Sequence, residues 1–207
     1  MKLDEQTNIC KLCFKDINSL SLSSLIGNNI SICKECSAKF LLHISKFHLN
    51  TIPGISLFRY DETIRKCLYK LKGCQDIELA PIFLEQYAYD LHLRFASYYI
   101  VPMPSWREDD LKRGFNHVIE IFRCLNLPIL PILYKKENIK QATLRKWQRT
   151  DMIDNIDIFA KRIIKNKKIL LVDDVMTTGS TLSGAIKVIK KCNPKDIKIL
   201  VLSKNEL

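Results

Sequence analysis

The sequence predicts an α/β fold in which a parallel sheet is covered by helices and preceded by a small cysteine-containing module. From residue 55 to the C-terminus, short β-branched runs alternate with segments of helical periodicity, which is typical of parallel strands joined by right-handed crossovers. Two closely spaced cysteine pairs lie within the first 37 residues. The 207 residues are enough for one full domain and a small module, but not for two large domains.

The composition is that of a folded protein without a membrane span. Hydrophobic residues make up 47% of the chain and charged residues 27%, which is the balance of a packed domain. The longest apolar runs are far shorter than the roughly 20 residues that cross a bilayer. Asp4 and Glu5 stand where a secretory signal would have basic and then apolar residues. We therefore expect a cytoplasmic protein, with its thiols kept reduced.

The first part of the chain divides into a module, a helix with a linker, and the start of the larger domain. After the cysteines, apolar side chains recur every three or four residues between Ser37 and Leu49, which predicts a helix. Pro53 and Gly54 predict the end of that helix. The expected divisions are residues 1–37 for the module, 38–54 for the helix and linker, and 55–207 for the larger domain.

Strands and helices alternate through the larger domain. Asp61 can cap a helix that closes at Gly73. Two basic stretches, one after residue 104 and one from residue 135 to 155, lack clear periodicity and are expected to be loops. The expected strands are 55–60, 98–101, 129–133, 168–172 and 197–202, and the expected helices are 61–73, 78–95, 115–125 and one that begins near 182 and stops at Asn193. In such sheets, ligands bind at the carboxyl ends of the strands.

Basic residues exceed acidic ones. The 33 Lys and Arg against 22 Asp and Glu give a formal net charge of +11, which favours binding to polyanions. Trp106 and Trp147 lie within the two basic stretches, where each can stack on a nucleic-acid base or simply pack against the protein. A run of lysines can also be no more than a solvated surface. The basic residues concerned are Arg107 and Lys112 in the first stretch, and Lys135, Lys136, Lys140, Arg145, Lys146 and Arg149 in the second.

The four N-terminal cysteines have the spacing of a metal site. Cys10, Cys13, Cys33 and Cys36 form the pattern C-x2-C-x19-C-x2-C, in which each pair can turn two thiolates toward one ion. Four thiolates leave no open coordination position, so we predict structural Zn²⁺. A redox pair, a disulfide pair and an iron–sulfur cluster remain the alternatives. The other cysteines lack motif spacing and are expected to be buried small apolar side chains: Cys67, Cys74, Cys124 and Cys192.

Residues 169–182, ILLVDDVMTTGSTL, combine a buried strand, two carboxylates, a hydroxyl-rich turn and the start of a helix. Backbone N–H groups at a helix N-terminus bind phosphate, and Asp173 and Asp174 can accept hydrogen bonds from the two adjacent hydroxyls of a ribose. The alternative is a turn whose hydroxyls only cap the helix. A P-loop is excluded because Gly-Lys-Ser/Thr is missing. The predicted phosphate-binding residues are Thr177, Thr178, Gly179, Ser180 and Thr181.

This segment resembles the phosphoribosyl pyrophosphate motif of the type I phosphoribosyltransferases. Residues 99–104 (YIVPMP) and 112–116 (KRGFN), with Gln141, Leu144, Arg149 and the cysteine module, are similar to ComF-type competence proteins of that superfamily. The resemblance implies the parallel-sheet phosphoribosyltransferase fold with an N-terminal zinc-ribbon-like module, and binding of phosphoribosyl pyrophosphate with Mg²⁺. It also implies a role in natural transformation, and it makes Lys72 and Arg113 candidate pyrophosphate contacts.

The resemblance leaves the chemistry open. An enzyme of this kind is a glycosyltransferase, in which a nucleophile displaces pyrophosphate from the ribose. Thr177 stands where some purine-salvage relatives have an acid that acts as base, Met152 departs from the family pattern after Arg149, and the acceptor is not evident from the sequence. The alternative is a non-catalytic protein that binds single-stranded DNA through the basic stretches and keeps the phosphoribosyl site as a sensor or relic. Other DNA-uptake proteins are possible partners.

Overall fold

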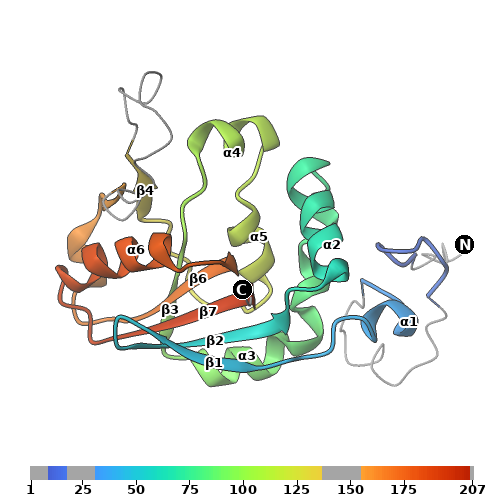
Figure 1. Cartoon of the computed structure of the whole chain (residues 1–207), viewed down its shortest axis with the longest axis horizontal. Coiled ribbons are helices and arrows are strands. Elements are labelled where there is room, and N and C mark those ends of the chain that lie inside the picture. Colours follow the sequence, from blue (N-terminus) through green and yellow to red (C-terminus); the bar gives the residue numbers. More distant parts are fainter. Residues whose placement is uncertain (1–8, 18–30, 137–154, 206–207) are drawn as a thin grey trace, which may run out of the picture.

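A five-stranded sheet with the order β1-β2-β7-β6-β3 forms the centre of the protein (Figure 1). The computed structural model describes residues 9–17, 31–136 and 155–205. In the central sheet, β2, β7, β6 and β3 are parallel and β1 is antiparallel to β2, which confirms the predicted, mainly parallel α/β class. The strands are β1 (Ser45–Leu49), β2 (Ile52–Arg59), β3 (Tyr98–Pro102), β6 (Lys168–Met176) and β7 (Asp196–Lys204).

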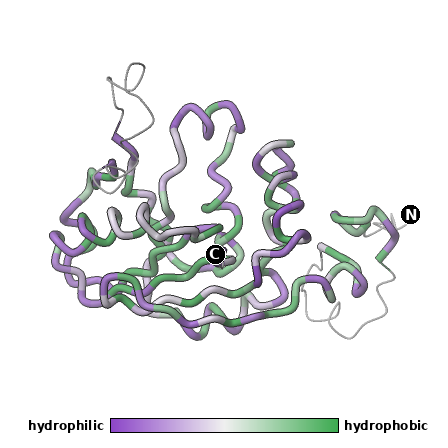
Figure 2. Tube along the Cα trace, in the orientation of Figure 1, coloured by the Kyte–Doolittle hydropathy of each residue, from purple (hydrophilic) through white to green (hydrophobic). Residues whose placement is uncertain are grey.

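Alternation of side chains along β6 and β7 divides the core into two layers. Leu170 and Val172 pack on one face of the sheet, in a cluster that includes side chains of α2, α3 and α5. Ile169 and Leu171 pack on the other face with α6 and a small sheet formed by β4 and β5. Figure 2 shows the hydrophobic colour along the central strands and mixed colours on the surrounding helices. The elements are α2 (Glu62–Gly73), α3 (Ala88–Phe95), α5 (His117–Arg123), α6 (Ser180–Lys190), β4 (Leu133–Lys135) and β5 (Ile156–Ile158).

The cysteine module shares its core with the rest of the protein. Cys10, Cys36 and Phe40 belong to the same buried cluster as Leu57 and Phe83, although the described residues of the module contribute only one short helix, α1 (Lys34–Ser37). Polar contacts at the same junction join Lys11 to Glu78 at 2.7 Å and the backbone N–H of Ser31 to Glu85 at 2.8 Å. The module is therefore packed against three 3-10 helices, η2 (Ile77–Leu79), η3 (Pro81–Phe83) and η4 (Glu85–Tyr87).

The helix predicted between residues 38 and 54 is wrong. Residues 45–49 form β1, and Pro53 and Gly54 lie inside β2. Phe47 and Leu49 alternate with the exposed Lys46 and His48, so the apolar period that matters here is two and not three to four. A two-residue turn with positive φ at both central residues joins the strands, as the twist of a tight hairpin favours. Residues 45–54 thus belong to the central sheet.

The remaining helices match the sequence predictions unevenly. Helix α2 begins after Asp61 and ends at Gly73 as expected. The predicted helix 78–95 is instead a series of 3-10 turns that includes Pro81 and leads into α3, and the loop expected after residue 104 contains a helix, α4 (Arg107–Arg113). In the parts of the chain that the structure describes, no helix has both the length and the apolar character needed to cross a membrane.

The strand predictions at the centre of the sheet are confirmed, and those near residue 130 are not. Strands β3, β6 and β7 contain the expected residues, with β6 and β7 extending further toward the C-terminus. The strand expected at 129–133 is reduced to a single bridge between Ile129 and Ile100, and the chain next pairs in β4. Pro128 directly precedes this segment and Pro131 lies inside it, and proline cannot donate a ladder hydrogen bond. The longest part of the basic connection, residues 137–154, lies outside the described residues.

The start of α2 depends on a side-chain cap. Oδ1 of Asp61 accepts a hydrogen bond from the backbone N–H of Ile64 at 2.9 Å. We expect Asp61→Ala to lower the free energy of unfolding by about 1 kcal/mol and Asp61→Asn to lower it much less, because asparagine is also a good N-cap. Urea denaturation of both variants checks this, and equal losses would remove the cap from the account of α2.

Candidate functional site

A polar cavity of about 290 Å³ opens where β3 and β6 end. This position agrees with the rule that ligands of parallel sheets bind at the carboxyl ends of the strands. The cavity brings together both carboxylates, one residue of the threonine loop and both candidate pyrophosphate contacts predicted from the sequence. Its lining residues are Lys72, Met103, Pro104, Ser105, Trp106, Asp109, Arg113, His117, Val118, Lys135, Asp173, Asp174 and Thr181.

The two carboxylates lie in the last part of β6 and interact with different sides of the sheet. The strand was expected to end at Val172, but it continues through Asp173 and Asp174 to Met176. Because successive side chains of a strand point to opposite faces, the two acids lie toward different layers of the protein although both border the cavity. Asp174 meets groups from α2 and α5, whereas the charge of Asp173 acts on Lys135 of β4.

Asp174 is a buried carboxylate with a cation beside it. Its side chain is 8% exposed and forms an ion pair with the ammonium group of Lys72, the penultimate residue of α2. Nε2 of His117 lies 3.6 Å from the same carboxylate oxygen. Burial alone would raise the pKa of Asp174, but His117 and Lys72 together hold that pKa below its usual value. Asp174 is therefore ionised throughout the neutral range.

Asp173 has the opposite electrostatic environment. Burial, followed by the neighbouring charge of Asp174, raises the pKa of the Asp173 carboxyl group well above its usual value. Two adjacent carboxylates at one strand end resist carrying two charges at once. The pair is thus divided into Asp174, whose charged form is favoured by groups of α2 and α5, and Asp173, whose charged form is disfavoured by burial and by its neighbour.

Arg113 is held by a network at the end of α4. One of its nitrogens, Nη1, donates to Asp110 at 3.0 Å and to Nδ1 of His117 at 3.1 Å, while Nε donates to the backbone carbonyl of Lys72 at 3.3 Å. Asn116 donates to the second oxygen of Asp110 at 2.9 Å. Lys72 and Arg113, which are 41 residues apart in the sequence, are therefore joined by a hydrogen bond. Both line the same cavity as Asp173 and Asp174.

The threonine loop forms the N-terminal end of α6. Gly179 has φ +74° and directly precedes Ser180, and the first N–H groups of a helix have no partner within the helix. Thr178 and Ser180 place their hydroxyl oxygens 3.0 Å apart on the exposed side of the turn. A Cβ atom at Gly179 would approach the side chain of Leu49 to 3.1 Å, so the backbone of this loop is close to β1.

Lys135 and His117 belong to the cavity in ways that the sequence analysis did not identify. Lys135 was predicted to be a surface DNA contact, but its ammonium group lies 5.0 Å from the centre of the Trp106 ring, and its burial lowers its pKa. In the sequence, Lys135 directly follows Tyr134 in a short segment that forms a strand, and this position could have indicated its place in the cavity. His117 immediately follows the recognised Asn116, which caps α5 by accepting from Ile119 at 3.0 Å.

The structure describes some of the other predicted DNA contacts. Arg107 and Lys112 are exposed on α4. Lys136 is exposed after β4 and lies 3.4 Å from Asp157. Trp106 is 42% exposed at the start of α4, so it is available on one side of its ring. The rest fall outside the described residues: Lys140, Arg145, Lys146, Trp147 and Arg149.

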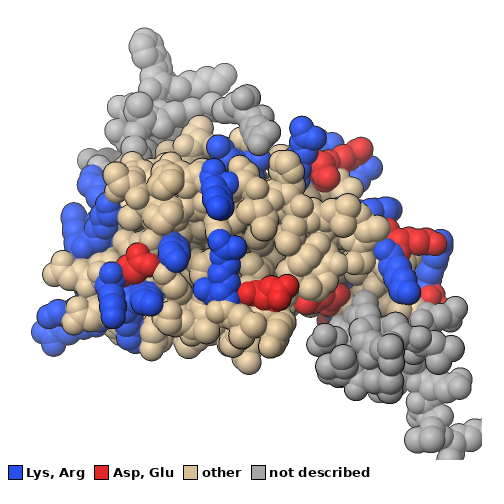
Figure 3. Space-filling model, turned by 90° about the horizontal axis from the view of Figure 1, so that it is seen from below, with Lys and Arg blue, Asp and Glu red and all other residues tan. Residues whose placement is uncertain are grey.

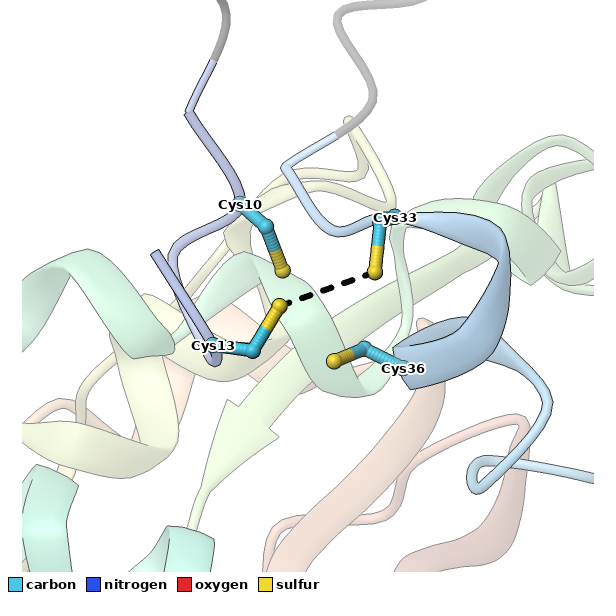
Figure 4. Close-up of side chains that lie close together, drawn as sticks. All are labelled: Cys10, Cys13, Cys33 and Cys36. Atoms are coloured by element: carbon cyan, nitrogen blue, oxygen red, sulfur yellow. Dashed lines mark hydrogen bonds between the residues drawn. The ribbon is translucent and has the colours of Figure 1, made fainter. Parts of the chain in front are cut away.

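The four N-terminal cysteines converge on one point (Figure 4). Their sulfur atoms all lie within 4.8 Å of one another, and the Cys13 and Cys33 sulfurs are 3.7 Å apart. This separation is far longer than a disulfide bond, and a tetrahedral ion with metal–sulfur bonds of about 2.3 Å needs sulfurs about 3.8 Å apart. The cluster can therefore hold a metal ion.

The thiols of the cluster titrate very unequally. Burial opposes ionisation of Cys10, but backbone N–H groups of Cys33, Cys13 and Leu12 lower the pKa of the Cys10 thiol to about 6. Burial and the neighbouring sulfurs raise the pKa of Cys36. Four thiolates within this distance require a cation. Among the other cysteines, Cys67 and Cys192 are buried as predicted and Cys124 is half-buried, but the prediction for Cys74 is wrong because it is exposed just after α2.

Comparison with known proteins shows which proteins the chain is similar to. A family model described as the phosphoribosyl transferase domain matches residues 115–206, which include His117, the acidic pair and the threonine loop. Competence protein ComFC of Streptococcus pneumoniae is 23% identical over 219 residues, covering 93% of this chain and 98% of that protein. The chain is thus similar to a competence protein ComFC along almost its whole length, and its C-terminal part matches the phosphoribosyl transferase domain.

Two further comparisons cover different shares of this chain. Competence protein F of Haemophilus influenzae is 30% identical over 115 residues, which are 51% of this chain and 49% of that protein. The chain thus spans about half the length of this relative. A crystal structure of adenine phosphoribosyltransferase from Saccharomyces cerevisiae is 14% identical, with a TM-score of 0.39, over 83% of this chain and 89% of that one.

The two left-handed glycines provide a matched test of the threonine loop. Gly114 has φ +83° with nothing near its potential Cβ, whereas Gly179 has a similar φ and the Leu49 side chain at 3.1 Å. We expect Gly114→Ala to cost roughly 1–2 kcal/mol from backbone strain alone, and Gly179→Ala to cost more because Leu49 must also move. Chemical denaturation of both variants measures the difference, and a smaller loss at Gly179 would contradict the close approach of the loop to β1.

Proposed function

We propose that this protein binds phosphoribosyl pyrophosphate with Mg²⁺ in the cavity at the ends of β3 and β6, and that it acts in the cytoplasm in DNA uptake during natural transformation. The observation that carries the first part is the convergence of Asp173, Asp174, Lys72 and Arg113 beside the N-terminus of α6. The relatives named competence protein ComFC and competence protein F support the second part.

The proposed ligand matches the cavity group by group. The ribose offers two adjacent hydroxyl donors for the carboxylates of Asp173 and Asp174, and its 5-phosphate fits the N–H groups and hydroxyls at the start of α6. The pyrophosphate carries most of the negative charge and would lie toward Lys72 and Arg113. Mg²⁺ is a hard cation that is usually bound together with substrate phosphates, and it supplies further charge neutralisation there.

Ligand binding changes the charge balance of the acidic pair. Without a ligand, Asp174 is paired with Lys72, and the raised pKa of Asp173 favours its protonated form. Ribose hydroxyls donate hydrogen bonds to the charged form of a carboxylate and so lower its pKa. We therefore expect ionisation of Asp173 to accompany binding, while Lys72 is shared between Asp174 and the incoming pyrophosphate.

If the protein is a transferase, a nucleophile forms a bond to the anomeric carbon while the bond from that carbon to pyrophosphate breaks. Positive charge develops on the ribose ring and negative charge on the leaving group. Asp173 and Asp174 lie on the ribose side and the two cations on the pyrophosphate side, so catalysis would consist mainly of positioning and electrostatic stabilisation. Thr177, which stands where some relatives have an acid, is exposed and cannot serve as a carboxylate base.

Replacing both acids tests ligand binding. We expect Asp173→Asn/Asp174→Asn to weaken binding of phosphoribosyl pyrophosphate with Mg²⁺ by two orders of magnitude or more, since each lost charge-assisted hydrogen bond contributes roughly 1.5–3 kcal/mol. Titration calorimetry measures the affinity. Asp76→Asn/Asp90→Asn, which changes two acids remote from the cavity lining, is the matched control.

Equal affinity of a folded double variant and the wild type would show that the acidic pair does not bind the ligand. Transferase activity is measured separately, by incubating the wild type with phosphoribosyl pyrophosphate, Mg²⁺ and a panel of nucleobases and following pyrophosphate release. Binding without release in any reaction would assign the site to a sensor, and release with one base would identify the acceptor.

We further propose that the cysteine cluster holds one structural Zn²⁺. The sulfurs are as close together as the ligands of a single ion. This separation supports zinc over an iron–sulfur cluster, in which the cysteines bind several different iron atoms and are farther apart. Lys15 and Lys34 are near the cysteines in the sequence, and Lys15 pairs with Glu35 at 3.0 Å. Because Cys10 and Cys36 lie in the same core as Phe40, the ion also supports packing outside the module.

Metal analysis of the Cys10→Ser/Cys13→Ser variant checks this proposal. We expect about one zinc per wild-type chain and none in the variant, with a lower melting temperature because the buried residues beside the cluster lose their support. Cys67→Ser/Cys192→Ser is the control for a simple loss of thiols. Full zinc content in the first variant, or iron in the wild type, would overturn the assignment.

A second candidate function, binding of single-stranded DNA, is favoured by a separate basic groove. Lys136, Lys161, Lys187 and Lys191 line a cavity of about 250 Å³ between α6 and the β4–β5 sheet, with Asp157 as the acid among its lining residues. Figure 3 shows basic side chains gathered toward the left end of the molecule, where α6 lies in Figure 1. We name these four lysines the lysine groove. It fits the phosphates of a polyanion.

The salt dependence of binding tests this second function. We expect labelled single-stranded DNA to bind with a logarithmic salt slope of about −0.7 for each phosphate contact, and Lys161→Gln/Lys191→Gln to make the slope smaller. Lys66→Gln/Lys70→Gln removes the same charge from the exposed side of α2 and serves as the control. Fluorescence anisotropy measures both, and identical slopes in the two variants would remove the lysine groove from the DNA-binding surface.

A further inference from the structure

We propose that His117 is a positioning residue, which holds Asp174 and Arg113 in one arrangement through a neutral imidazole ring. This inference rests on the proposed function, because Asp174 is assigned to the ribose side of the site and Arg113 to the pyrophosphate side. His117 would then couple the two halves of one ligand site without itself contacting the reacting atoms.

The imidazole ring lies between the two groups. His117 is the first residue of α5 and is 7% exposed. Its Nδ1 atom faces Nη1 of Arg113 at 3.1 Å, and its Nε2 atom faces the buried carboxylate of Asp174 at 3.6 Å. The ring therefore bridges the end of α4 and the end of β6.

Hydrogen-bond chemistry determines the tautomer. A guanidinium group has donors only, so Nδ1 of His117 must accept from Arg113. The proton of the neutral ring is then on Nε2, where it points toward the carboxylate of Asp174. Protonation of Nδ1 would place an N–H group directly against the guanidinium and would break the contact with Arg113.

The charges around the ring favour this neutral form. Three charged groups face the ring: Asp174 from β6, Lys72 from α2 and Arg113 from α4. Asp173 lies next to Asp174, and Asp110 holds Arg113. Burial is the largest influence and lowers the pKa of His117, Asp174 raises it, and the two cations lower it further. Ser105, whose hydroxyl lies 3.5 Å from Nδ1, completes the surroundings. The net effect keeps the ring uncharged at neutral pH.

Loss of the ring would affect both ends of the site. Arg113 would retain Asp110 and the carbonyl of Lys72 but would lose the acceptor that turns Nη1 toward the cavity. Asp174 would retain Lys72 alone, so that cation would be less available to a pyrophosphate. A residue that only filled space at this position would have neither effect.

Three substitutions separate these effects. His117→Gln retains an amide near Nε2 that can donate to Asp174, His117→Asn retains a carbonyl near Nδ1 that can accept from Arg113, and His117→Leu retains volume alone. We expect the leucine variant to bind phosphoribosyl pyrophosphate with Mg²⁺ at least roughly tenfold more weakly at pH 7.5, because Arg113 and Asp174 each lose one buried polar neighbour, and the amide variants to recover part of that loss. Calorimetry measures all four proteins, and melting temperatures report folding.

The pH dependence distinguishes positioning from packing. The ordinary pKa of histidine is about 6.5, and that of the His117 ring is lower. As the pH falls toward the pKa of the ring, the affinity of the wild type should fall relative to that of His117→Gln. The ratio of the two affinities is compared because the ligand phosphate itself titrates near pH 6 and affects both proteins equally. A constant ratio from pH 7.5 to 5 would overturn the positioning role.

Nitrogen NMR of the His117 ring in the ligand-free protein keeps this inference separate from the proposed function. The expected result at pH 7 is a neutral ring with its proton on Nε2. A proton on Nδ1, or a charged ring, would overturn the inference even if the ligand binds. Failure of the wild type to bind phosphoribosyl pyrophosphate would overturn the proposed function instead, and with it the ligand role of His117, whatever the NMR result.

Discussion

Burial of the Asp174 carboxylate is the constraint on which the arrangement of the site depends. A charge that is 8% exposed must be paired, because an uncompensated buried ion costs several kcal/mol. Lys72 and His117 provide that pairing, and each comes from a different helix. The ends of α2, α5 and β6 therefore have to meet at one point. Arg113 joins them through the backbone carbonyl of Lys72 and the ring of His117.

The alternation of β6 explains why two neighbouring acids differ so strongly. Asp174 interacts with the layer of α2 and α5, which contributes Lys72 and His117, while Asp173 interacts with the layer of α6 and β4, which contributes Lys135. The pKa of Asp174 is lowered and that of Asp173 is raised. A ligand that lies across the end of β6 would thus meet one carboxylate whose charged form is favoured and one whose charged form is disfavoured, between the N-terminus of α6 and the cations Lys72 and Arg113.

The cysteine module is connected to this arrangement through packing. Its Cys10 and Cys36 lie in the core cluster that also contains Leu68 and Leu71 of α2, the helix that carries Lys72. A metal ion in the cluster would stabilise a module whose described residues include one short helix and would support the same core. One hydrophobic layer therefore connects the cysteine module with the helix that borders the cavity at the strand ends, although none of the residues named here belongs to both sites.

The sequence by itself determined the features that depend on local chemistry and spacing. The capped helix α2, the buried runs of β6 and β7, the four converging cysteines, and the order of strand, acids, threonine loop and helix were all predictable, because each is encoded within a short segment. Lys72 and Arg113 were recognised only as candidates from a family resemblance.

Only the tertiary structure decided which distant groups meet. The periodicity between residues 37 and 49 fitted a helix, but pairing with β2 and β7 made it a hairpin of the central sheet. The sequence does not distinguish Lys135 from the other lysines, whereas the structure places its ammonium group near the Trp106 ring. The proposed role of His117 depends on its contacts with Arg113 and Asp174. These contacts arise from the packing of separate elements, so no local pattern in the sequence records them.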